Sequence, residues 1–464
     1  MNPAFLGLAV EEYIDSGQFF EELSILVGLR TASTEAGAGV AATAYFERAI
    51  APLLESIGCT YRVIANDSHP SAPFLLAHRF EDESFPTVLL YGHADVVEGQ
   101  PEAWTEGSGP WTLTAVGDRW YGRGTADNKG QHLLNLAALR MLVREQGRLG
   151  FNLTVLLESG EEVGSPGLAE FAVAHRDELQ ADVFIGSDGP RLDADVPTLF
   201  LGARGGVNIE LEADLRDGQH HSGNWGGVLR NAATTIAGAI GTLVNGHGQI
   251  TCEALLPPSL PASVRSALAG VDITDRIGPR IDENWADPAL TPAERLFGWN
   301  TLEVLALDAG NPAAPVNAIP GTARAVLQLR FVVGTELDGL QDRLRQHLDL
   351  HGYSMVRVNL GMAFPASRTD PDHPWARWAA ESIRRVVGDR LVVLPNIGGS
   401  LPNHVFTDIL GLPTLWVPHS YPGCNQHAPN EHLLESIARE GMAIAVALFR
   451  DLGNRPLNLE LLHD

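Results

Sequence analysis

Two adjacent glutamates, Glu161 and Glu162, follow a run of apolar residues in the segment FNLTVLLESGEEVGSPG. The apolar run, residues 151–157, predicts a buried strand, so the pair falls where a strand opens into a loop. Neighbouring side chains on extended backbone point in opposite directions, so one carboxylate can bind a fixed partner while the other faces a substrate. Such carboxylates can ligate a metal ion or move a proton. Taken alone, the pair is better explained as an acidic surface loop ahead of a helix.

Other polar clusters at predicted strand ends carry metal-binding residue types. They are YGHADVVEG, GRGTADNKG, FIGSDGP and GCNQHAPNEH. Their residues His93, Asp127, Asp188 and His427, together with Glu162, supply the imidazole and carboxylate donors that bind zinc or a similar metal. Two metals about 4 Å apart can share one bridging carboxylate. Each residue alone has a structural explanation, such as a helix cap for Asp127, but five together are unlikely to be a coincidence.

Strands alternating with helices are expected to position these clusters. The predicted helices are 8–29, 37–58, 129–145 and 167–178, and the predicted strands are 61–65, 74–78, 87–91, 151–157 and 182–188. Alternation of this kind predicts an α/β domain whose central sheet is mostly parallel.

The pattern changes near Arg204. From there the order is strand, helix, strand, strand, helix, strand, with a Pro-rich interruption over residues 255–292. This order predicts an inserted α+β two-layer sandwich. After about Met362 the α/β pattern returns, with strands within 390–395 and 414–420 and a closing helix over 431–452. We therefore expect a catalytic domain formed by 1–203 and 363–464, and an inserted domain at 204–362.

The composition excludes some classes of function. The chain has 464 residues and a formal net charge of -25, which disfavours a nucleic-acid partner because phosphate binding needs clustered Lys and Arg. No apolar stretch approaches the length of a membrane span, and the acidic N-terminal segment does not resemble a signal peptide. The three cysteines are too few and too scattered for a disulfide framework. We expect a cytoplasmic protein.

Taken in order, the motifs HAD, GRGTADNKG, GEEVGS, SD, HHSGNWGG and HAPNE resemble the M20 family of dinuclear zinc peptidases, which includes carboxypeptidase G2, the carnosinases and acetylornithine deacetylase. The resemblance covers almost the whole chain. It implies two divalent metal ions, with zinc as the first expectation and manganese or cobalt as alternatives. It also implies that Asp127 bridges them, with His93 and Asp188 on one ion and Glu162 and His427 on the other. A cis peptide between Asp127 and Asn128 is implied as well.

The resemblance also assigns catalytic roles. Glu161 would be the general base that takes a proton from the attacking water and delivers it to the leaving amine. Asp95 would orient the other ring nitrogen of His93. In HHSGNWGG, His221 matches a histidine that polarises the scissile carbonyl, commonly in the partner subunit's active site, so a homodimer is implied.

Substrate-binding residues are implied by two further segments. In VNAIPGTARAVLQLRFV, Asn317 and Arg330 match residues that bind the terminal carboxylate of the substrate, a task that suits the planar fork of arginine. In NIGGSLPNHVF, Gly399 and Ser400 match donors to the substrate.

Three functions remain open on this sequence. The first is a metal-dependent exopeptidase that cleaves dipeptides or short peptides with a free carboxyl end. The second is an N-acyl amino acid deacylase of the acetylornithine deacetylase or succinyl-diaminopimelate desuccinylase kind. The third is a non-catalytic metal-binding or oligomerising scaffold, which Glu161 disfavours because a metal binder does not need an uncoordinated carboxylate beside a ligand. The substrate is expected to be small, with no nucleic acid or membrane involved.

Overall fold

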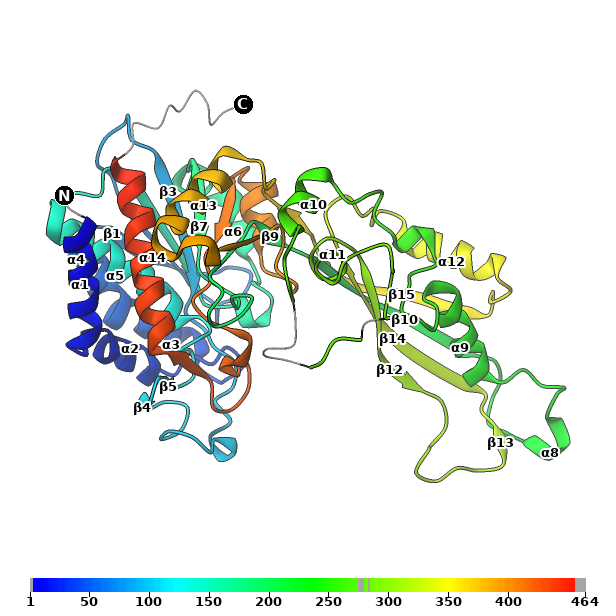
Figure 1. Cartoon of the computed structure of the whole chain (residues 1–464). Coiled ribbons are helices and arrows are strands. Elements are labelled where there is room, and N and C mark those ends of the chain that lie inside the picture. The colour runs from blue at the N-terminus through cyan, green and yellow to red at the C-terminus, as the bar shows by residue number, and fades with distance from the viewer. Residues whose placement is uncertain (1–2, 274–278, 283, 455–464) are drawn as a thin grey trace.

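The computed structural model describes residues 3–273, 279–282 and 284–454 of the chain. Figure 1 shows an α/β domain formed by both ends of the chain and an elongated second domain, β10 to β15, that projects from it. The two domains are joined where β9 (Gly202–Ala203) pairs with β16 (Ser367–Arg368). A Cβ atom on Gly202 would lie 2.1 Å from the Ser367 carbonyl oxygen, so this close crossing requires glycine.

The α/β domain contains an eight-stranded sheet with a parallel centre. Its order is β1 (Thr60–Ile64), β2 (Phe74–Arg79), β6 (Asn152–Glu158), β3 (Thr87–His93), β7 (Val183–Gly186), β18 (Thr414–Trp416), β8 (Thr198–Phe200) and β17 (Val392–Leu394). Strands β6, β3, β7 and β18 run parallel, whereas β1, β2 and β8 pair antiparallel with a neighbour. The expected α/β fold is confirmed, and its sheet is mixed.

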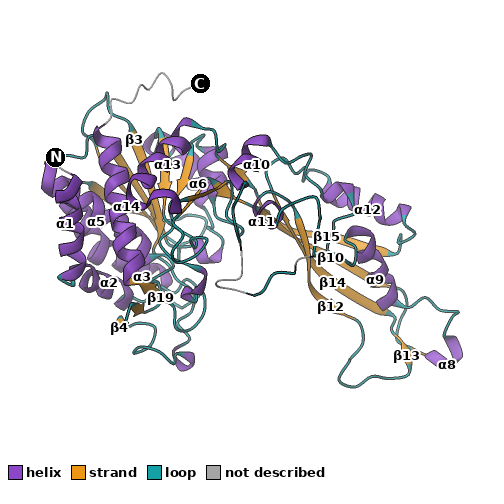
Figure 2. Ribbon diagram, viewed as in Figure 1, coloured by secondary structure: helices purple, strands orange, loops and turns teal. Residues whose placement is uncertain are grey.

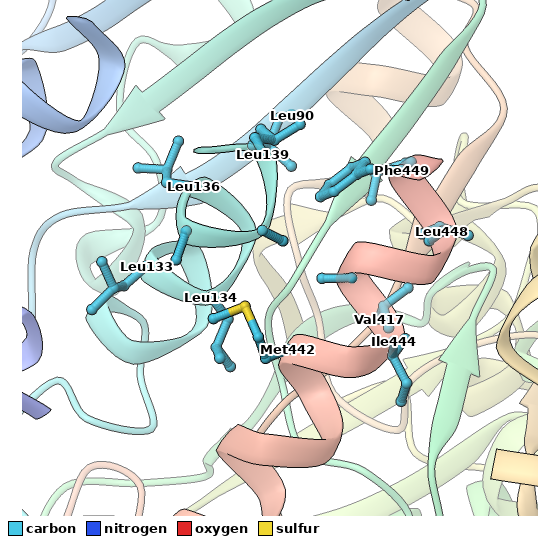
Figure 3. Close-up of a cluster of buried hydrophobic side chains, with 14 of the residues drawn as sticks. Leu90, Leu133, Leu134, Leu136, Leu139, Val417, Met442, Ile444, Leu448 and Phe449 are labelled. Carbon is cyan, nitrogen blue, oxygen red and sulfur yellow. The ribbon is translucent and has the colours of Figure 1, made fainter. Parts of the chain in front are cut away.

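Helices cover both faces of this sheet (Figure 2). They are α1 (Pro3–Asp15), α2 (Gln18–Gly28), α3 (Ala38–Tyr45), α4 (Ala51–Ile57), α5 (Lys129–Gln146), α6 (Leu168–Ala174), α7 (Arg176–Leu179), α13 (Pro374–Val387) and α14 (Glu435–Asn454). Every residue of α5 from Lys129 to Leu142 is buried. Figure 3 shows Leu134 of α5 beside Met442 of α14, and the leucines of α5 belong to the main hydrophobic core, which therefore fixes the helix that follows Asp127.

The second domain is a four-stranded antiparallel sheet with helices on one face. The strand order is β12 (Thr301–Asp308), β14 (Thr322–Phe331), β10 (Gly205–Asp214) and β15 (Val356–Phe364). Apolar residues of these strands form a separate core with α9 (Ala232–Leu243) and α12 (Leu340–Leu350). At the far end, β11 (His220–His221), α8 (Ser222–Trp225) and β13 (Ala318–Ile319) form the tip (Figure 1). The expected two-layer sandwich is therefore present.

Three details differ from the sequence prediction. The first predicted helix is two helices, because Gly17 adopts φ 78° between α1 and α2. The closing helix begins at Glu435, after strand β19 (His432–Leu434) has paired with β5 (Arg119–Tyr121). Within the Pro-rich interruption, α10 (Ala262–Leu268) packs on the α/β domain beside α11 (Pro292–Phe297), in one cluster with strands β8 and β17.

Residues 274–278 and 283 of the Pro-rich interruption lie outside the described residues, as do 1–2 and 455–464 of the expected catalytic domain. Among the helices that the structure describes, none combines the length and apolarity needed to cross a membrane.

Candidate metal centre

Three of the five predicted ligands lie at the carboxyl ends of adjacent parallel strands. His93 is the last residue of β3, Asp188 lies two residues beyond β7, and Glu162 lies in the short helix η3 (Glu161–Val163) after β6. Asp127 and His427 lie further from the strand ends. His427 lies in the long loop that follows β18, which is also a strand of the central sheet. Asp127 precedes α5 and follows β5, which belongs to a separate three-stranded sheet, so the expectation that the ligands follow strands of one sheet is wrong for Asp127 alone. The loops nevertheless bring them to the same point.

The carboxylate of Asp127 divides the cluster into two groups of donors. Its Oδ1 lies 3.0 Å from His93 Nε2, which is 3.5 Å from Asp188 Oδ2. Its Oδ2 lies 3.0 Å from His427 Nε2, which is also 3.0 Å from Glu162 Oε2. Within each group the donor atoms lie within 4.8 Å of one another. This division is the pairing that the family resemblance implies.

The donor atoms are suited to divalent cations. Glu162 Oε1 and Asp188 Oδ2 are buried and have no hydrogen-bond partner among the described residues. Burial, together with the nearby carboxylate of Asp127, raises the pKa of Glu162 to about 7 and that of Asp188 to about 6. A cation between these groups would stabilise the charged carboxylates. Imidazole nitrogen and carboxylate oxygen are the donor set of zinc and of similar borderline metals.

Asp95 contacts both the histidine and the glutamate pair. Its Oδ1 accepts a hydrogen bond from the Glu161 N–H at 3.2 Å, and its Oδ2 accepts one from the Glu162 N–H at 3.1 Å. His93 Nδ1 lies 3.0 Å from the Asp95 carbonyl oxygen and 3.5 Å from Asp95 Oδ1. Both contacts hold the His93 ring with Nε2 toward Asp127, and the carboxylate also fixes the turn that carries Glu161 and Glu162. The Asp127–Asn128 peptide bond is cis.

The cluster opens into a cavity of about 660 Å³ between the two domains. Its wall includes Glu161, Glu162 and His427 on one side, and Arg330 and Ser400 on another. Burial, together with the carboxylates of Asp188 and Asp127, raises the pKa of Glu161. The carboxyl group predicted to act as the base therefore lies beside two of the donor residues, Glu162 and His427, at the wall of a space of substrate size.

Arg330 of β14 reaches the cavity from the second domain. Its Nη1 donates to Ser400 Oγ at 2.8 Å and its Nε donates to Gln328 Oε1 at 3.0 Å, while Nη2 has no partner among the described residues. Ser400 Oγ in turn donates to the Arg204 carbonyl oxygen at 2.9 Å. This leaves a guanidinium N–H available to an anionic group in the cavity. Gly399, also predicted to bind substrate, does not line this cavity.

His221 and Asn317 lie together but far from this cluster. His221 is in β11, which pairs with β13, and the Ser222 N–H donates to the Asn317 carbonyl oxygen at 2.9 Å. Both residues are exposed at the tip of the second domain, and Figure 1 shows that tip at the end of the domain most distant from the central sheet. Within one chain, therefore, these two residues do not join the metal-ligand cluster.

Several residues at the centre were not predicted from the sequence. Gln426 Nε2 donates to Asp127 Oδ2 at 3.3 Å, and Asn208, Gln328 and His404 line the cavity. Gln426 could have been noticed because it directly precedes His427. Gln328 and His404 lie within the two segments already considered for substrate binding, but no motif position pointed to them. Asn208 lies in no such segment, so only the folded chain reveals it.

The chain combines an α/β domain, a second domain inserted in it, and two groups of donors that share one carboxylate near the strand ends. This combination is typical of metallopeptidases. A comparison with family models then identifies the family. The model described as peptidase family M20/M25/M40 matches residues 89–451, so the chain belongs to this family and is a peptidase-type hydrolase. This finding confirms the resemblance and argues against a non-catalytic scaffold.

Relatives and solved structures agree with this assignment. The chain is 31% identical over 333 residues to the cysteinylglycine-S-conjugate dipeptidase of Corynebacterium striatum, covering 68% of this chain and 70% of that protein. It is 25% identical over 403 residues to the beta-Ala-His dipeptidase of Rattus norvegicus, covering 83% and 81%. Its fold is similar to that of an M20 family metallo-carboxypeptidase from Sulfolobus solfataricus, with a TM-score of 0.76, 24% identity, and coverage of 94% and 99%.

Proposed function

We propose that this chain is a metal-dependent dipeptidase that hydrolyses the amide bond of dipeptides or short peptides with a free C-terminal carboxylate. The proposal depends on the position of Asp127. Each of its two oxygens faces an imidazole and a second carboxylate, and one of these carboxylates, that of Glu162, is the neighbour of Glu161. The names of the relatives support it, because the proteins similar to this chain include a cysteinylglycine-S-conjugate dipeptidase and a beta-Ala-His dipeptidase.

His93 and Asp188 would hold one divalent ion, Glu162 and His427 the other, and Asp127 both. Two such ions, zinc in our first expectation, supply Lewis acidity that makes a water molecule a good nucleophile near neutral pH. The Glu161 carboxylate accepts the proton of the attacking water and then gives it to the nitrogen of the leaving amine. The buried carboxylate of Asp95 holds the Glu161 N–H, which keeps this base in place.

The substrate carboxylate would bind at Arg330 and Ser400. Arg330 lines the same cavity as Glu161, so a short peptide anchored at this guanidinium would place its amide bond near the base. A substrate anchored at its C-terminal carboxylate needs little further contact, which favours short peptides.

We also propose a homodimer in which the tip of one chain completes the site of the other. His221 would polarise the scissile carbonyl, and Asn317 would contact the substrate carboxylate. The support is that both residues are adjacent and exposed at the tip, away from the cluster of their own chain. The edge strand β12 adds exposed apolar side chains, with Leu305 and Leu307 each 55% exposed.

The test is hydrolysis of a mixed panel of free dipeptides and N-acyl amino acids by protein stripped of metal and then reloaded with zinc, manganese or cobalt. We expect metal-dependent release of amino acids from the dipeptides. Preference for the N-acyl half of the panel would instead identify a deacylase. Glu161→Gln should retain metal, measured by elemental analysis, and lose turnover. A panel that stays silent although metal is bound would contradict the proposal.

A further inference from the structure

Glu431 joins two loops of the metal centre. It is fully buried, lies four residues after His427, and directly precedes β19. Its Oε1 accepts hydrogen bonds from the backbone N–H groups of Gly124 and Ala126, each at 3.0 Å, and of Asp127 at 3.1 Å. The Glu431 side chain therefore binds the backbone of Asp127 and of the loop that precedes it.

The other half of the carboxylate is also paired. Oε2 accepts a hydrogen bond from Arg123 Nη1 at 2.6 Å, and Arg123 Nη2 donates to the Glu98 carbonyl oxygen at 3.1 Å. The backbone contributes too, because the Gly122 N–H donates to the Glu431 carbonyl oxygen at 3.0 Å. Both carboxylate oxygens are thus bound by donors that fix the 122–127 loop.

The geometry of the two loops explains why His427 and Asp127 need additional contacts to hold them in position. The His427 side chain is 59% exposed, and its backbone has φ 58°, so packing alone does little to hold this ligand. Gly124 has φ 88°, and a Cβ atom there would lie 2.8 Å from Lys129 Cδ, so the loop before Asp127 is also an irregular turn. Neither loop is part of the central sheet.

We propose that Glu431 is a positioning residue for the metal centre, which sets the position of Asp127 relative to His427. It touches neither substrate nor the expected metal ions, and acts through the backbone of one ligand and the loop of the other. Charge-assisted hydrogen bonds to backbone N–H groups are strong and directional, which suits this role. The inference rests on the proposed function, since it assumes that the two donor groups bind metal.

The principal variant is Glu431→Gln, which keeps an oxygen for the three N–H groups but places an NH₂ group against Arg123. We expect metal affinity to fall by about 10-fold to 100-fold, the usual effect of losing a residue that orients a ligand. The loss should fall mainly on the ion held by Glu162 and His427, so that about one ion per chain remains tightly bound. The measurement is competition with a chelating dye, alongside the unfolding temperature of the metal-free protein.

A matched control is Glu294→Gln. Glu294 is also buried, accepts a backbone N–H from Thr291 at 2.8 Å and pairs with Arg265 at 3.0 Å, but lies in α11 away from the cluster. We expect this control to keep wild-type metal affinity even if it lowers the unfolding temperature. An equal loss of affinity in the control would show a general effect of destabilisation and overturn the assignment.

Wild-type affinity for both ions in a folded Glu431→Gln protein would also overturn it. If Glu431→Gln does not fold, the test is made with Arg123→Lys, which keeps a positive charge beside Glu431 Oε2 but loses the planar fork of arginine. We expect this variant to bind metal more weakly, and unchanged metal affinity would contradict the assignment. Failure of the wild-type protein to bind metal would contradict the proposed function itself, so the two failures are distinguishable.

Discussion

At the scale of single residues, the centre depends on carboxylates that are buried close together. Asp127, Glu162 and Asp188 lie within two overlapping groups of donors, and burial raises the pKa of the last two. Such a cluster is unfavourable without positive charge. The imidazoles of His93 and His427 stand between the carboxylates, where cations would also be held.

The role of Arg330 can be tested against a neighbour on the same strand. Arg330→Met removes the guanidinium from the cavity, and the loss of a charged hydrogen bond of about 1.5–3 kcal/mol should raise KM for dipeptides by about 10-fold to 100-fold. Metal content should not change. KM is measured from initial rates.

Arg324→Met is the control, because Arg324 also lies on β14 but pairs with Glu210, and its side chain is 57% exposed. It should leave KM at the wild-type value. Equal KM values for both variants would show that Arg330 does not bind the substrate.

At the scale of elements, the position of α5 matters because Asp127 lies just before it. Leu134 of α5 is fully buried and lies beside Met442 of α14 (Figure 3). Leu134→Ala should lower the free energy of unfolding by about 2–5 kcal/mol through lost burial and a residual cavity. Denaturant unfolding of the metal-free protein measures this loss.

Ile25→Ala serves as the comparison, because Ile25 lies on α2 with 60% of its surface exposed. It should change the free energy of unfolding by less than about 0.5 kcal/mol. A similar loss in both variants would mean that the α5–α14 contact is not a main source of stability.

Most elements were predictable because their signal is local. The apolar run before Glu161 marked strand β6 in the right place, and the order of strands and helices after Arg204 indicated the two-layer second domain. The break at Gly17 was missed because the apolar spacing continues across it. Strand β19 was missed because its three residues pair with β5, more than three hundred residues earlier, and no local pattern records that pairing.

The candidate site likewise has parts with a local sequence signal and parts that depend on contacts between distant segments. The five donors were found through motifs, each of which is short and contiguous. The contacts of Glu431 with Gly124 and Asp127 span sequence separations of 307 and 304 residues, so they could not be inferred from residue types and spacing. The place of His221 at the tip also depends on the fold of the whole second domain.

At the scale of the whole molecule, the proposed dimer predicts complementation. Glu161→Gln and His221→Ala homodimers should each be nearly inactive. After the two are mixed and allowed to exchange subunits, half of the dimers are hybrids, and each hybrid has one intact site. We therefore expect about a quarter of wild-type activity to return, measured as dipeptide hydrolysis.

The control is a mixture of two preparations of Glu161→Gln, which should stay inactive under the same exchange conditions. Sedimentation velocity should show a dimer in every sample. A dimeric mixture that exchanges subunits but recovers no activity would contradict the shared site.

The insertion of the second domain also affects the order of events on the ribosome. Strand β18, synthesised after that domain, lies between β7 and β8, which are synthesised before it. At the usual rate of translation, roughly 10 to 40 s pass between the emergence of β8 and that of β18. The strands of the second domain are contiguous in the sequence apart from the Pro-rich interruption, so this domain can fold in the interval. During the same time the central sheet is incomplete, and the edge of β7 has no partner strand. A nascent chain stalled before β18 should therefore be a preferred client of ribosome-associated chaperones.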